Sequence, residues 1–310
     1  MKIKGSAKKL TAKTVIVAAA VLGALLLGVR CWQSFTLIDP ATGFFTDHKN
    51  ITVMPSYILA VGFALIVPLL AYLTPLSKAE YIAPAKRPLH AVGCVALAAG
   101  IALDAVKPLF GEEKTRLTVV TALLGAAAAA ALILCSTAFL TGRDLVRKAK
   151  LLMVFPALWA LAKTLTYFSY YTSYIKVSAL LLAIFADVFL MIFLFEYGKK
   201  VTGLGGDGNS PSYLASALVC AALQLSAAAT GIAGLIKHTE FLYTPFAFCR
   251  LAAVLFCLTG IALFLKNNVP DYVPKAAIET HPLEADAAAA PAPEKASEKA
   301  PEETETNDEA

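Results

Sequence analysis

The stretch LTVVTALLGAAAAAALILCSTAFL, residues 117–140, decides the fold because it runs for 24 residues without a charged side chain. A helix rising 1.5 Å per residue needs about 20 such residues to cross a hydrocarbon layer about 30 Å thick. Lipid offers no partner for backbone N–H and C=O groups, so a segment of this kind must be helical. The stretch therefore predicts a transmembrane helix.

Seven further stretches on either side have the same character. With the first they predict an all-α, polytopic transmembrane helix bundle of about eight spans. The seven are residues 14–29, 51–74, 89–106, 151–172, 177–197, 213–236 and 244–265.

Composition supports a lipid environment for most of the chain. Hydrophobic residues make up 58% and charged residues 16%, and the mean hydropathy is +0.67, whereas about 25% of residues are charged in soluble domains. The cysteines are scattered without a CxxC pair, so we expect no disulfide framework, metal site or cofactor. They are Cys31, Cys94, Cys135, Cys220, Cys249 and Cys257.

Three regions follow from the charge pattern. Residues 1–13 form a basic N-terminus, residues 14–266 the transmembrane domain, and residues 267–310 a disordered acidic tail, since they are too poor in large apolar residues to fold. With both termini in the cytoplasm, the inner connections carry sixteen Lys and Arg residues and the outer ones seven, as the positive-inside rule requires. We expect the first span to be retained, because no small-x-small cleavage site follows it.

Lys163 and Asp187 are the most unusual residues inside the spans. Lys163 lies twelve residues into the fifth span and Asp187 ten into the sixth, so both are near mid-membrane. The connection of residues 173–176 is short, which makes these spans a helical hairpin with both charges at matching depth. We predict that they pair. The pair can be a structural salt bridge or a ligand or proton site, or the side chains can separate toward water.

An aromatic stripe accompanies Lys163 on the fifth span by three- and four-residue spacing. It can line a ligand site or supply cation–π contacts, or it can be ordinary packing. Two secondary polar residues, Asp104 and Arg250, lie toward outer span ends, where they can pair or reach water. The stripe consists of Phe155, Trp159, Tyr167, Tyr170 and Tyr174.

No enzymatic motif is complete. The sequence GLGGDG at residues 203–208 follows no strand and lacks the lysine and hydroxyl of a phosphate loop. Residues Glu112, Glu113 and Arg116 are one residue short of the EExxxR spacing of certain membrane proteases. The basic excess of the membrane portion is a topology signal, and no nucleic-acid partner is expected.

Three segments resemble an uncharacterised family of multi-span membrane proteins from low-GC Gram-positive bacteria. They are IDPATGFF at residues 38–45, FPALWALAK at residues 155–163, and the run of residues 178–197 around Asp187. The resemblance implies a bacterial cytoplasmic membrane and no particular activity.

Three function classes remain open from the sequence. The chain can bind or transport a small molecule at the fifth and sixth spans, act as a sensory protein, or serve as a structural or assembly factor. The bilayer is its expected partner; neither the ligand nor the oligomeric state follows from the residues.

Overall fold

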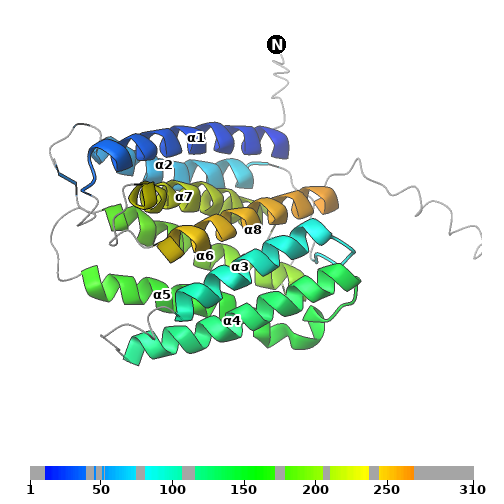
Figure 1. The fold of residues 1–310 in the computed structure, drawn as a ribbon. Helices are drawn as coiled ribbons and strands as arrows, with labels where there is room; N and C mark the ends of the chain where they lie inside the picture. The colour runs from blue at the N-terminus through cyan, green and yellow to red at the C-terminus, as the bar shows by residue number, and fades with distance from the viewer. Residues whose placement is uncertain are drawn as a thin grey trace, which may run out of the picture. The chain divides into compact units, whose positions relative to one another are not determined.

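The computed structural model describes residues 11–39, 45–46, 51, 53–74, 81–106, 116–171, 179–204, 210–236 and 244–268. These residues form eight α-helices and one 3-10 helix (Figure 1). The elements are α1 Ala12–Thr36, α2 Val53–Tyr72, α3 Pro88–Val106, α4 Arg116–Thr141, η2 Val146–Val154, α5 Phe155–Tyr171, α6 Ala179–Thr202, α7 Ser210–Ile236 and α8 Thr244–Asn268.

All eight predicted spans are present as helical segments long and apolar enough to cross a membrane. The prediction of an all-α polytopic bundle is confirmed, and the chain is a multi-pass membrane protein. The quoted stretch of residues 117–140 becomes α4, extended by one residue at each end. The proposed tail lies outside the described residues from residue 269 onward.

Two span boundaries differ from the prediction. Helix α1 continues past residue 29 to Thr36, because Arg30 and Gln33 are buried within the protein and need no water. The predicted fifth span begins instead as η2, in which Ala149 has non-helical dihedrals (φ −116°, ψ 47°). The α-helical part of that span therefore starts at Phe155.

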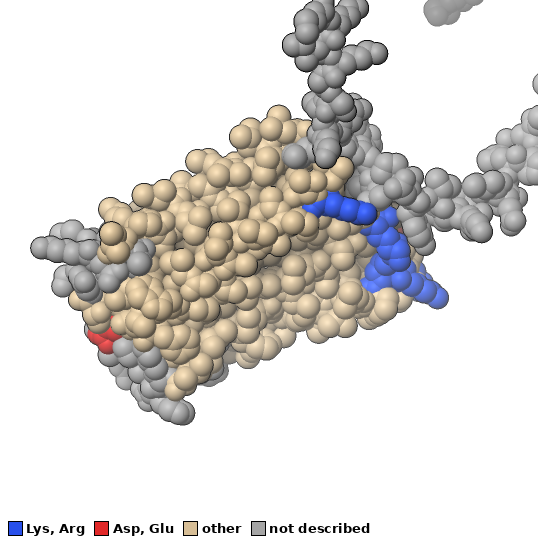
Figure 2. All heavy atoms as spheres, turned by 90° about the horizontal axis from the view of Figure 1, so that it is seen from above, with Lys and Arg blue, Asp and Glu red and all other residues tan. Residues whose placement is uncertain are grey.

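The outer sides of the helices carry large apolar side chains. Ile58, Leu65 and Leu123 are 71%, 67% and 67% exposed. In Figure 2 the middle of the face in view carries no coloured charge, while Lys and Arg atoms gather at one end and acidic atoms lie at the other. An uncharged belt between polar ends is the surface that a bilayer requires.

We call the end where α3 begins and α8 ends the basic end. The helix ends and connections that meet there hold most of the described cations. They are Lys13, Lys86, Arg87, Arg143, Arg147, Lys148, Lys150, Lys199, Lys200 and Lys266.

Six helices form a closed ring. Each helix from α3 to α8 packs against the next, and α8 packs back against α3. Helices α1 and α2 pack against each other and against α7, so they lie outside the ring, at the top of Figure 1. Gly100 allows the closure, since a Cβ there would lie only 3.0 Å from the Cys249 Cα on α8.

Candidate functional site

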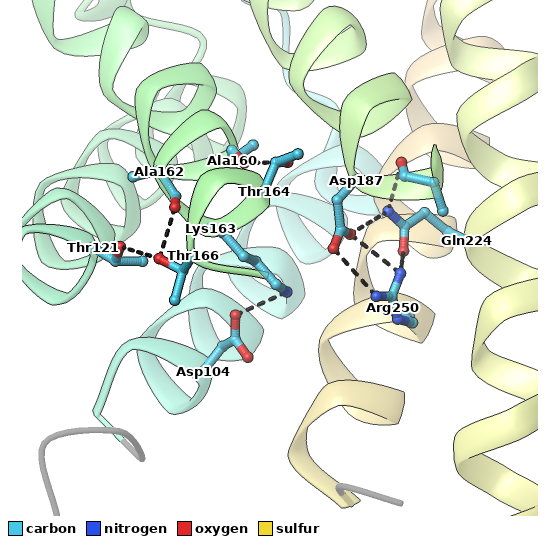
Figure 3. A network of polar contacts seen from close by, with 11 residues as sticks. Asp104, Thr121, Ala160, Ala162, Lys163, Thr164, Thr166, Asp187, Gln224 and Arg250 are labelled. Atoms are coloured by element: carbon cyan, nitrogen blue, oxygen red, sulfur yellow. Dashed lines mark hydrogen bonds and ion pairs between the residues drawn. The ribbon is translucent and has the colours of Figure 1, made fainter. Parts of the chain in front are cut away.

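Five polar side chains from five helices of the ring point into its interior (Figure 3). Asp104 comes from α3, Lys163 from α5, Asp187 from α6, Gln224 from α7 and Arg250 from α8. None is more than 8% exposed. We call this group the charge cluster; it holds two cations and two anions and is neutral overall.

Arg250 and Asp187 form a two-pronged ion pair. The guanidinium donates from Nη1 to Oδ1 and from Nη2 to Oδ2 of Asp187, both at 3.2 Å. This fork geometry matches a planar guanidinium to a planar carboxylate and fixes their relative orientation. The pair therefore joins α6 to α8 in a defined register.

Gln224 completes this half of the cluster. Its Nε2 donates to Asp187 Oδ1 at 3.1 Å and to the Ala186 carbonyl at 3.0 Å, and its Oε1 accepts from Arg250 Nη1 at 2.8 Å. Gln224 was not predicted as a site residue. A lone glutamine in a span carries little signal by itself, because its partners come from two other helices.

Lys163 pairs with Asp104 in the other half. The Nζ–Oδ2 distance is 2.8 Å, and the ammonium also lies 5.1 Å from the Trp159 ring centroid. Trp159 is fully buried, one turn before Lys163 on α5. The predicted cation–π contact to the aromatic stripe is present at this residue.

The predicted Lys163–Asp187 pair is corrected by these contacts. Both residues are buried and face the ring interior, but the ion pairs join Lys163 to Asp104 and Asp187 to Arg250. Both alternatives for Asp104 and Arg250 are wrong: each pairs with a residue other than its predicted partner, and neither reaches water. Their side chains point into the ring, where neighbouring helices surround them instead of headgroups or solvent.

The two halves of the cluster face each other in the ring interior (Figure 3). Lys163 and Asp104 form one half, and Asp187, Gln224 and Arg250 form the other.

The rest of the predicted aromatic lining is only partly described. Phe155 is half-buried at the start of α5. The side chains of Tyr167 and Tyr170 and the whole of Tyr174 lie outside the described residues. Trp159 is thus the described aromatic side chain of the stripe that contacts the charge cluster.

A second polar group occupies the ring interior nearer the basic end. His90 on α3 bonds through Nε2 to the Tyr197 hydroxyl at 2.8 Å and through Nδ1 to Thr259 Oγ1 at 3.2 Å. Cys135 Sγ lies 2.9 Å from the same hydroxyl. The sequence pattern did not predict this group. His90 is 2% exposed and links α3 to α6 and α8.

The charge cluster and this second group lie well apart along the helices. Asp187 and Tyr197 are separated by ten residues of α6, which corresponds to roughly 15 Å of helical rise. Among the described residues, no His, Cys, Asp and Glu side chains are grouped so as to hold a metal ion.

A cavity of about 360 Å³ lies between α2 and α6. It is lined by apolar groups, including Tyr57, Leu182 and Phe185, and by no member of the charge cluster.

Comparisons of the chain with protein-family models, curated proteins and solved structures give no match. The site is therefore interpreted from its own geometry.

Proposed function

We propose that the protein binds a small charged solute inside the six-helix ring, in exchange for one of the two ion pairs of the charge cluster, and that this binding serves transport across the membrane. The observation that carries the proposal is the meeting of four buried charges from four helices in the ring interior. The proposed site therefore involves five helices and not only the hairpin of the fifth and sixth spans.

The energetics of buried charge favour a functional role. Each charged residue near the centre of a membrane helix costs about 2.5–3.5 kcal/mol on insertion scales. Well-packed apolar residues in place of a buried ion pair are often neutral or stabilising for a fold. Packing alone therefore gives little reason for Asp104, Lys163, Asp187 and Arg250 to share one interior.

The chemistry of the cluster suggests how a solute is held. A carboxylate or phosphate on a solute can take the place of Asp104 beside Lys163, and an ammonium can take the place of Lys163 beside Asp104. The Trp159 face adds attraction for a cation. A solute that carries both groups pairs with Lys163 and Asp104 together, so neither charge is left unpaired in the membrane.

The orientation forms part of the proposal. The basic end is placed in the cytoplasm, since Lys and Arg accumulate on the cytoplasmic side of multi-pass proteins. The bacterial cytoplasmic membrane is the proposed location, based on the resemblance of residues 38–45 and 155–163 to a bacterial family.

A structural role is the second candidate. The Arg250–Asp187–Gln224 arrangement favours it, because a two-pronged ion pair and a bridging amide form a network that locks three helices. A lock of this kind fixes the register of α6, α7 and α8 without any ligand.

The two candidates are separated by ligand-induced stabilisation of the purified protein. Amino acids, carboxylates, amines and phosphate esters are screened for a rise in the unfolding temperature of the wild type, of a double variant with Asp104→Asn and Lys163→Gln, and of a control with Glu196→Gln and Lys199→Gln. The control removes an ion pair of 2.6 Å that lies toward the basic end of α6.

The proposed function predicts that a solute at 100 times its Kd stabilises the wild type and the control by about 2.7 kcal/mol and the Asp104 and Lys163 variant much less. A solute that stabilises all three proteins equally binds elsewhere and contradicts the proposal. If no charged solute stabilises the wild type, the structural role is favoured.

A further inference from the structure

Two connecting segments at the basic end form one continuous face. The first is residues 81–87, which precede α3, and the second is residues 142–154, which include η2. The Ile82 N–H donates to the Lys200 carbonyl at 3.0 Å and the Arg87 N–H donates to the Phe139 carbonyl at 2.8 Å. These backbone bonds fix the first segment against α6 and α4.

Side chains also join the two segments. The Arg147 guanidinium lies 5.8 Å from the centre of the Tyr81 ring. Gly142, at φ 71°, lies beside the stem of Lys86, where a Cβ would be 3.6 Å from Cγ. The two segments therefore hold each other in place, and their cations lie on a fixed backbone.

The face is strongly basic and open to its surroundings. It consists of the exposed residues Lys86, Arg143, Arg147, Lys148 and Lys150, which we call the basic face. Asp144 is the one acidic residue within the two segments. Its carboxylate accepts from the Arg147 backbone N–H at 3.3 Å, so it caps the chain at this point.

The basic face borders the apolar surface of the protein. Leu151 follows Lys150 directly and is 82% exposed, and Val154 at the end of η2 is 37% exposed. Cations beside exposed apolar side chains are typical of segments at the level of lipid headgroups, where acyl chains meet the apolar groups and phosphates meet the charges.

We propose that the basic face binds the headgroups of anionic phospholipids. Fixed cations attract negatively charged lipids over zwitterionic ones, and each Lys or Arg near an anionic surface strengthens the attraction about fivefold. Exposed Leu151 contacts the acyl chain of the same lipid. The inference is independent of any solute bound in the ring, which lies within the helices.

The test measures lipid binding to the full-length protein by native mass spectrometry, with phosphatidylglycerol and phosphatidylcholine as probes. The test variant carries Lys148→Gln and Lys150→Gln. The matched control carries Lys13→Gln and Lys266→Gln, which remove two charges at the same end but outside the basic face. All four lysines are exposed, so circular dichroism should show unchanged folding in both variants.

We expect the test variant to bind phosphatidylglycerol about 25-fold more weakly than the wild type, with phosphatidylcholine binding unchanged and the control within about twofold of the wild type. Equal losses in the test and control variants would overturn the proposal, since they indicate a response to net charge only. Equal affinity of the wild type for the two lipids, or displacement of phosphatidylglycerol by millimolar inorganic phosphate, would overturn it as well.

Discussion

Replacing Arg250 with methionine leaves the Asp187 carboxylate, which is 1% exposed, without its guanidinium partner in the ring. Removing one member of a buried ion pair costs about 3–5 kcal/mol of unfolding free energy. Asp187→Leu alone should cost a similar amount, since it leaves the buried Arg250 charge without its carboxylate partner. The double variant removes both charges, and its main remaining cost is the Gln224 Oε1 left without the Arg250 donor, about 1–3 kcal/mol. The pair should therefore show a coupling energy of at least about 3 kcal/mol.

The assay is unfolding by sodium dodecyl sulfate in mixed micelles, followed by circular dichroism, for wild type, both single variants and the double variant. The same cycle on Glu196 and Lys199 is the control, because that pair is short but its side chains are 11% and 23% exposed. The two residues are three apart on one helix and partly exposed, and pairs of this kind couple by less than about 1 kcal/mol. Equal coupling energies in the two cycles would refute the reasoning that burial and the two-pronged geometry make the Arg250 pair strong.

Three further outcomes are expected. Gly125→Ala places a Cβ 2.6 Å from a side chain of α3 and should lower the unfolding free energy by about 1–3 kcal/mol. Gly62→Ala, whose Cβ would have nothing within 4 Å, should not destabilise the protein, and the same unfolding assay compares the two variants. Tyr197→Phe removes the hydroxyl shared by the histidine and cysteine and should cost about 1–3 kcal/mol; no loss would contradict those bonds. In cysteine-free protein in intact cells, a membrane-impermeant maleimide should label Arg116→Cys and not Arg143→Cys; the reverse labelling would invert the topology.

The helices themselves could be predicted from the sequence. Span length and the absence of charge are local properties, and α4 differs from residues 117–140 by one residue at each end. Boundaries failed where tertiary contacts override hydropathy. Arg30 ended the predicted first span, yet it is 2% exposed in the structure, and α1 continues past it.

The membership of the charge cluster could be predicted only in part. Lys163 and Asp187 were recognised as buried, but hairpin reasoning considers only neighbouring spans. The actual partners, Asp104 and Arg250, lie on α3 and α8, whose contact closes the ring between helices distant in sequence. That closure depends on close approach at Gly100, which leaves no periodic signal.

The pairing of Lys163 is the most direct test of the central claim. Two double-mutant cycles measure its coupling with Asp104 and with Asp187 in the same unfolding assay, using Lys163→Met with Asp104→Leu or Asp187→Leu. The 2.8 Å contact predicts that the coupling of Lys163 with Asp104 exceeds its coupling with Asp187 by at least about 2 kcal/mol. A larger coupling with Asp187 would contradict the two-pair charge cluster.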